Sequence, residues 1–176
     1  MIWIVLALEI LVLPLQWVGA AVLAAAIHEA FHYLAVRLCG GEIMGFTVGV
    51  SGAKLAVRGL SNGQEIFCAL AGPMGGLLLL LGLRWIPRTA LCAAFQSVFN
   101  LFPVYPLDGG RALRCGLEWW LPPERVDGVM LWLGRCAMVG AVLLGLYATV
   151  CMGLGLMPML LSAVFCGKIA CKPLRH

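Results

Sequence analysis

Residues 15–38 read LQWVGAAVLAAAIHEAFHYLAVRL, a run without proline that is followed by Gly40-Gly41. Its length and apolar character are typical of a helix that spans a membrane, which needs about 20 residues, and the two glycines are a helix-stop signal. The run also carries His28-Glu29-Ala30-Phe31-His32, with three ionisable groups that are costly to bury in a bilayer. We therefore predict a membrane helix that contains a functional polar site.

The composition of the whole chain agrees with a membrane protein. Of its 176 residues, 62% are hydrophobic and 11% are charged, against about 45–50% and about 25% in soluble domains. This composition excludes a water-soluble globule, a disordered chain and a nucleic-acid-binding module. We predict an all-α polytopic membrane protein with about five to six transmembrane helices, because each span must satisfy its backbone polar groups internally.

Apolar runs on both sides of the first helix predict the other helices. Residues 1–13 are apolar but shorter than the roughly 17–25 residues of a span, so they are either a thin first span or an interfacial segment. Further helices are expected at about 65–83, from about 89 to the break at Pro103, and at 109–120, 127–150 and 154–168.

The segment 42–58 has a different period from the helices. Apolar residues alternate there with small or polar ones, as in Phe46, Thr47, Val48, Gly49 and Val50. A period of two around a glycine-containing turn predicts a β-hairpin. We expect this small hairpin to be membrane-associated and to lie near the H-E-x-x-H helix, because only a few residues separate the two.

The distribution of basic residues predicts the orientation in the membrane. Nine Lys and Arg fall on the side at which the 15–38 helix ends, and two, Arg84 and Arg88, fall on the other side. Because basic loops stay inside, the first side is cytoplasmic. We expect an integral, multi-pass protein whose active site opens toward the cytoplasm and whose C-terminus is cytoplasmic.

The H-E-x-x-H motif is the strongest chemical signal in the chain. His28 and His32 share one helix face, so both can reach one metal ion, and Glu29 could take a proton from an attacking water. A catalytic zinc site needs a third protein ligand. Asp108 is the one acidic residue that follows a broken helix at matching depth. The alternative role for Asp108 is the N-cap of the following helix.

Residues 100–111 read NLFPVYPLDGGR. Together with His28-Glu29-x-x-His32, this segment resembles the site-2 protease family of intramembrane zinc metalloproteases. The nearest likeness is to the compact branch typified by stage IV sporulation protein FB. The resemblance runs from about residue 15 to about residue 115, and it includes the hairpin and Ala71-Gly72-Pro73.

The resemblance implies hydrolysis of a peptide bond in or near a transmembrane segment of a membrane protein or pro-protein, as in regulated intramembrane proteolysis. It implies one zinc ion held by His28, His32 and Asp108, with Glu29 as general base and Asn100 near the substrate. The expected partners are that substrate, which is a sporulation protein if the sub-branch holds, the lipid bilayer and an inhibitory membrane partner, with no nucleic acid.

We expect the hairpin residues 46–50 to bind the substrate by β-strand addition, because a helical substrate must be unwound before it is cut. One domain is expected over 1–176, with its core at 15–115 and additional C-terminal helices at 127–168. No PDZ or CBS domain is expected.

Three alternatives remain open. A different H-E-x-x-H membrane metalloprotease would use a downstream glutamate such as Glu118 or Glu124 as its third ligand. A metal transporter would need polar ligands distributed along several spans, which are nearly all apolar here. A catalytically silent, substrate-binding homologue would have lost the base or a ligand, and this chain retains both.

Overall fold

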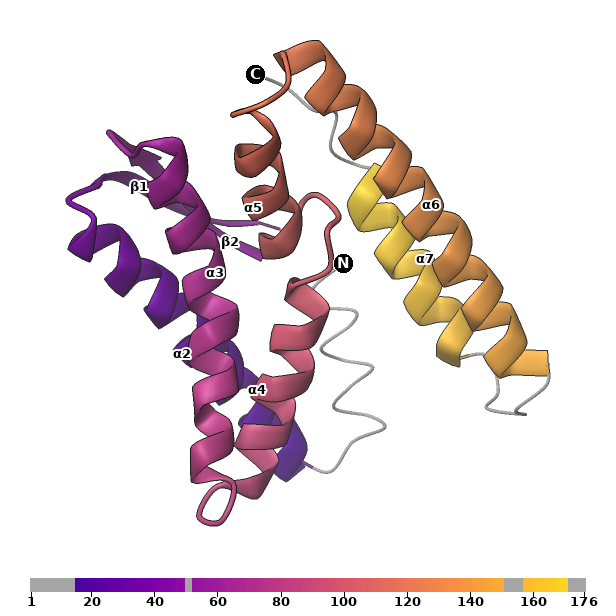
Figure 1. Ribbon diagram of the computed structural model, residues 1–176. Coiled ribbons are helices and arrows are strands. Elements are labelled where there is room, and N and C mark those ends of the chain that lie inside the picture. Colours follow the sequence, from indigo (N-terminus) through magenta and orange to yellow (C-terminus); the bar gives the residue numbers. More distant parts are fainter. Residues whose placement is uncertain (1–14, 50–51, 151–156, 171–176) are drawn as a thin grey trace. The chain divides into compact units, whose positions relative to one another are not determined.

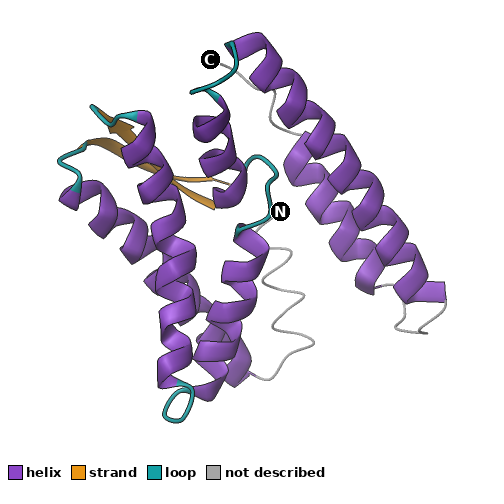
Figure 2. Ribbon diagram, viewed as in Figure 1, coloured by secondary structure: helices purple, strands orange, loops and turns teal. Residues whose placement is uncertain are grey.

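The computed structural model describes residues 15–49, 52–150 and 157–170 (Figure 1). The chain divides into two compact units, Met1–Phe102 and Pro103–His176. The described residues form six α-helices, a short 3-10 turn and two strands (Figure 2). The organisation as one domain stays a prediction.

Three helices of the first unit pack against one another. They are α2 (Leu15–Leu38), α3 (Asn62–Leu78), which the 3-10 turn η1 (Leu79–Gly82) continues, and α4 (Pro87–Asn100). Small side chains fill the faces at which these helices meet, and small residues let helices approach closely. They are Ala20, Ala24, Ala35, Ala69, Ala71, Ala90 and Ala93 and the glycines Gly72, Gly75 and Gly76.

Local signals set the ends of these helices. Helix α2 ends where Gly40 adopts a positive φ of 72°. The amides of Gly40 and Gly41 donate to the carbonyls of Arg37 and Val36, the hydrogen-bond pattern of a Schellman motif. Helix α3 begins with a capping box between Ser61 and Gln64, which satisfies amides that the first turn leaves without partners.

The two strands predicted within 42–58 are present and antiparallel. Strand β1 (Glu42–Gly49) pairs with β2 (Gly52–Arg58) from Glu42↔Arg58 to Gly49↔Gly52, with a bulge between Ile43 and Gly45. Both strands contact α2. Residues 50 and 51 lie outside the described part of the chain, and the membrane association of the strands stays a prediction.

The second unit contains α5 (Asp108–Leu117), α6 (Pro123–Val150) and α7 (Met157–Ala170). Helices α6 and α7 lie side by side along their length (Figure 1). The guanidinium of Arg114 joins α5 to α6, because it lies 3.1 Å from the carboxylate of Glu118 on one side and 3.1 Å from that of Asp127 on the other.

Three described helical segments are long and apolar enough to cross a membrane: Leu15–Leu38, Asn62–Gly82 and Pro123–Tyr147. Helices α4 and α7 have 14 residues each, fewer than the roughly 17–25 residues of a full span. The expected segment 1–13 lies outside the described residues. The three spans indicate an integral, multi-pass membrane protein, and its orientation stays a prediction.

Candidate metal centre

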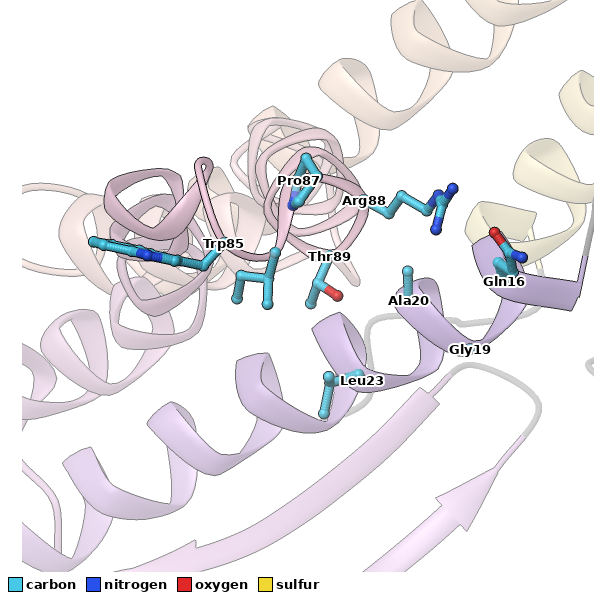
Figure 3. Close-up of a pocket in the computed structure, with 9 residues that line it drawn as sticks. Gln16, Gly19, Ala20, Leu23, Trp85, Pro87, Arg88 and Thr89 are labelled. Carbon is cyan, nitrogen blue, oxygen red and sulfur yellow. The ribbon is translucent and has the colours of Figure 1, made fainter.

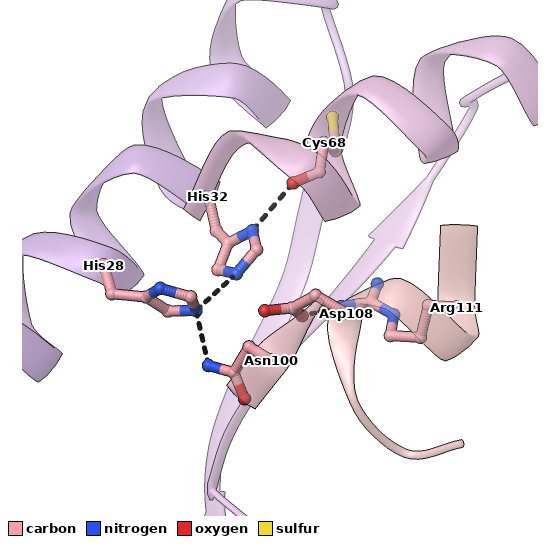
Figure 4. Close-up of polar contacts among 6 residues, drawn as sticks. All are labelled: His28, His32, Cys68, Asn100, Asp108 and Arg111. Atoms are coloured by element: carbon pink, nitrogen blue, oxygen red, sulfur yellow. Dashed lines mark hydrogen bonds and ion pairs between the residues drawn. The ribbon is translucent and has the colours of Figure 1, made fainter. Parts of the chain in front are cut away.

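The two histidines of the motif lie one turn apart on α2 and face each other. Both are buried, with 3% of His28 and 8% of His32 exposed. Their Nε2 atoms lie 3.1 Å apart (Figure 4). The rings meet edge to face at 83°, with their centroids 4.8 Å apart. The helix therefore brings two potential ligand atoms to one point.

The backbone of α3 fixes the tautomer of His32. Its Nδ1 atom lies 2.7 Å from the carbonyl oxygen of Cys68. A carbonyl oxygen only accepts, so Nδ1 carries the hydrogen, and Nε2 of the neutral ring presents its lone pair. Histidines that bind metals are held in this way by a partner on their other nitrogen.

Asn100 approaches the pair from the C-terminal end of α4. Its side-chain amide nitrogen lies 3.1 Å from Nε2 of His28. An amide nitrogen only donates, so Nε2 of His28 is the acceptor and also presents a lone pair. Two lone pairs that face each other repel, unless a cation lies between them.

The geometry of the pair fits a tetrahedral metal ion. Zinc binds histidine nitrogen at about 2.0–2.1 Å, so two such ligands in a tetrahedron lie about 3.3–3.4 Å apart. The 3.1 Å separation of the two Nε2 atoms is close to this value. The residues of the first unit therefore suit two ligand positions of a zinc ion.

Glu29 follows His28 on α2 and is half-buried. Successive residues of an α-helix are turned by about 100°, so its carboxylate leaves the helix beside the imidazole face. This position suits a proton acceptor next to the metal better than a third ligand on the same face.

Asp108, in the second unit, is the first residue of α5. The N-cap is Leu107, and no side-chain capping hydrogen bond is present there, so Asp108 is not the N-cap. Its carboxylate is largely buried and lies 3.9 Å from the guanidinium of Arg111 (Figure 4). A Cβ atom on Gly110 would overlap the backbone of Val104 and Tyr105, so the turn before α5 requires a glycine.

The residues expected to bind substrate lie on β1. Phe46, Thr47, Val48 and Gly49 are part of the strand, and Val50 lies outside the described residues. The two strands form a two-stranded sheet, so within the described chain each strand pairs on one edge only.

An open cavity of about 260 Å³ lies elsewhere in the first unit (Figure 3). Gln16 and Leu23 of α2 and Trp85, Arg88 and Thr89 around the start of α4 are among its lining residues. It contains none of the predicted site residues and is not the metal centre.

Sequence reasoning missed two contributions from α3. The carbonyl of Cys68 holds His32, and Gly72 lies against both imidazoles. Gly72 belongs to the Ala71-Gly72-Pro73 element noted in the sequence, but that pattern gave it no role in the metal centre. A backbone carbonyl has no side-chain signal at all.

No family model matches the chain. It is 28% identical over 120 residues to a protein of Synechocystis sp. described as "Putative zinc metalloprotease sll0528". The match covers 59% of this chain and 31% of that protein, so the chain spans about a third of the length of its curated relative.

The fold is similar to that of a protease of known structure. The site-2 protease from Methanocaldococcus jannaschii matches with a TM-score of 0.74 and 18% identity, over 99% of this chain and 88% of that one. At this identity the likeness is evidence for a shared fold only.

Proposed function

We propose that this chain is an intramembrane zinc metalloprotease of the site-2 protease type. One observation carries the proposal. The Nε2 atoms of His28 and His32 converge at 3.1 Å on a helix apolar enough to span a membrane, and Cys68 holds His32 with its lone pair toward that point. The shared fold and the distant zinc-metalloprotease relative support the same assignment.

The third ligand in this proposal is Asp108. We propose that it completes the ligand set of His28 and His32, as the resemblance of the two motifs to the site-2 protease family implies. Asp108 is the first residue of α5 rather than its N-cap, and its carboxylate is largely buried. The competing ligand Glu118 accepts a hydrogen bond from Arg114 at 3.1 Å, which disfavours the alternative metalloprotease type.

A bound zinc ion would polarise the scissile carbonyl and lower the pKa of a water molecule toward about 7. Glu29 accepts the proton of the attacking water and delivers it to the leaving amine. The lone pair on Nε2 of His28 can bind a metal ion or accept a hydrogen bond from the Asn100 amide, but not both. Metal binding would therefore leave the amide donors of Asn100 for the substrate backbone or the developing oxyanion.

The substrate in this proposal is a transmembrane segment of a membrane protein or pro-protein. Residues 46–49 would bind it, because strand β1 has an edge that β2 does not pair; the expected fifth residue, Val50, lies outside the described residues. An unwound substrate segment could add to that edge through backbone hydrogen bonds. We also propose a sporulation protein as the substrate, an inhibitory membrane partner, and an active site that opens to the cytoplasm.

The test combines metal analysis with a cleavage assay. The full chain is purified in detergent, its zinc content is measured, and it is incubated with membrane-protein substrates, with and without a chelator. We expect about one zinc per chain, and cleavage that stops on chelation and returns with added zinc. His28→Ala should lose zinc and cleavage, whereas Arg88→Ala, at the separate cavity, should retain both. Bound zinc without cleavage of any substrate would favour the silent homologue.

A further inference from the structure

Helices α2 and α3 meet at the metal centre through two matched faces. His28 and His32 lie one turn apart on α2, and Cys68 and Gly72 lie one turn apart on α3. Residues four apart share a helix face. The Cys68 carbonyl accepts a hydrogen bond from Nδ1 of His32 at 2.7 Å, so the backbone of α3 holds this imidazole through the nitrogen that is not the proposed ligand atom.

Gly72 lies against the other side of the same imidazole. A Cβ atom at this position would lie 2.6 Å from Cε1 of His32 and 2.8 Å from Nε2 of His28, and it would also overlap Nε2 of His32. Separations under 3.0 Å are essentially never found for real Cβ atoms. The atoms that a side chain would displace are the two proposed ligand atoms.

The imidazoles have little freedom to move away from such a side chain. Both rings are buried, and a rotation of His32 would break its hydrogen bond to Cys68. A buried donor or acceptor that loses its partner is strongly unfavourable. A methyl group at position 72 must therefore shift the rings or separate α3 from α2.

We infer that Gly72 is a positioning residue of the metal centre. Its missing side chain leaves the space in which Nε2 of His28 and Nε2 of His32 converge, while the Cys68 carbonyl, one turn earlier, sets the tautomer of His32. This role rests on the proposed function, because it deepens the account of the same site. The proposed function itself assigns no role to Gly72.

Gly75 provides a matched control on the same helix. A Cβ atom there would overlap the ring of Phe31 and lie 2.7 Å from its Cδ1 atom. It would thus disturb the packing of α2 against α3, and its three nearest neighbours are all atoms of Phe31 rather than of a histidine. Gly19 provides a second control, because nothing lies within 4 Å of a Cβ atom there.

The first experiment compares the zinc affinities of Gly72→Ala, Gly75→Ala and Gly19→Ala in the purified full chain, by competition with a chelator. We expect Gly72→Ala to bind zinc at least about tenfold more weakly, the effect typical of losing ligand orientation, and the two controls to stay close to wild type. Equal losses in Gly72→Ala and Gly75→Ala would overturn the inference, because general helix packing would then explain both.

The second experiment needs no metal. Nitrogen-15 NMR of the histidine side chains in the metal-free protein should show the Nδ1–H tautomer of His32 in wild type and Gly75→Ala, and its loss in Gly72→Ala. An unchanged His32 signal in Gly72→Ala, together with wild-type zinc affinity, would overturn the inference. Absence of zinc from the wild type would overturn the proposed function, and the NMR comparison would still decide the role of Gly72.

A double-mutant comparison covers the case in which Gly72→Ala folds poorly. In the His28→Ala/His32→Ala background, the atoms that the new methyl group meets are gone. We expect Gly72→Ala to lower the thermal unfolding temperature of the wild type but to have little effect in this background. An equal loss in both backgrounds would mean that Gly72 serves something other than the histidines.

Discussion

The direction of lone pairs governs the chemistry at the scale of single residues. His32 can serve a metal through Nε2 because its Nδ1 hydrogen is donated to the Cys68 carbonyl. The amide of Asn100 selects the acceptor role for Nε2 of His28 in the same way. Both neighbours act through the protonation pattern of a ligand, so a change near the site can abolish metal binding without removing a ligand.

Glu29→Gln separates catalysis from metal binding. The amide keeps the size and shape of the side chain but cannot take up a proton at neutral pH. We expect zinc content to stay at the wild-type level and cleavage to fall by at least about a hundredfold, as is typical of losing a general base. Substantial residual cleavage would refute the assignment of the base. Loss of zinc would instead make Glu29 a ligand or a structural residue.

Asp108→Asn tests the third ligand. The substitution replaces an anionic oxygen ligand with a neutral one and keeps the shape of the first turn of α5, so both zinc affinity and cleavage should fall. Metal analysis and the cleavage assay measure the two effects. Arg111→Gln is the matched control, because it removes the ion pair at 3.9 Å but leaves the carboxylate in place. If Asp108→Asn retained full zinc and normal cleavage, Glu118 would be the next ligand to test.

At the scale of elements, each helix supplies a different part of the site. Helix α2 supplies the two histidines and Glu29, α3 supplies the Cys68 carbonyl and the space at Gly72, and α4 ends at Asn100. Strand β1 follows α2 after only three residues, Cys39 to Gly41. A peptide added to β1 would therefore bind to an element that is tied to the histidine helix.

Val48→Pro tests substrate binding by β1. Proline removes a backbone donor of the strand and fixes φ. We expect zinc content and expression to be retained and cleavage to fall severely, as measured with the same substrate assay. Val48→Ala keeps the backbone donor and should cleave like the wild type. Cysteines placed at Thr47 should also crosslink to residues beside the scissile bond. Normal cleavage by Val48→Pro without such crosslinks would mean that the substrate binds elsewhere.

At the scale of the whole molecule, the distribution of basic residues predicts the orientation. Arg37 and Arg84 are both exposed and lie at opposite ends of the helices of the first unit, Arg37 in the last turn of α2 and Arg84 just after η1. In a cysteine-free variant, Arg37→Cys should react with a membrane-impermeant thiol reagent only from the cytoplasmic side, and Arg84→Cys only from the other side. The reverse pattern would place the opening of the active site on the outer face.

The sequence by itself determined the helices, the strands and the chemistry-bearing motifs. The end of α2 follows from Gly40-Gly41, the break after α4 from Pro103, and the shared face of the histidines from their spacing. These features depend on neighbours within a few residues, so a local pattern predicts them. The expected five to six spans are shown only in part, since three described segments meet the length and apolarity of a span. Helices α4 and α7 have only 14 residues each.

Only the tertiary structure decided which groups fix the tautomers of the two histidines. The Cys68 carbonyl reaches His32 across 36 residues of sequence, and Asn100 reaches His28 across 72. The structure also showed that Leu107, and not Asp108, occupies the N-cap position of α5. Hydrogen bonds between helices depend on how closely the helices pack and how they are rotated. A carbonyl that every residue carries, or a glycine among many, has a specific role only once that packing is known.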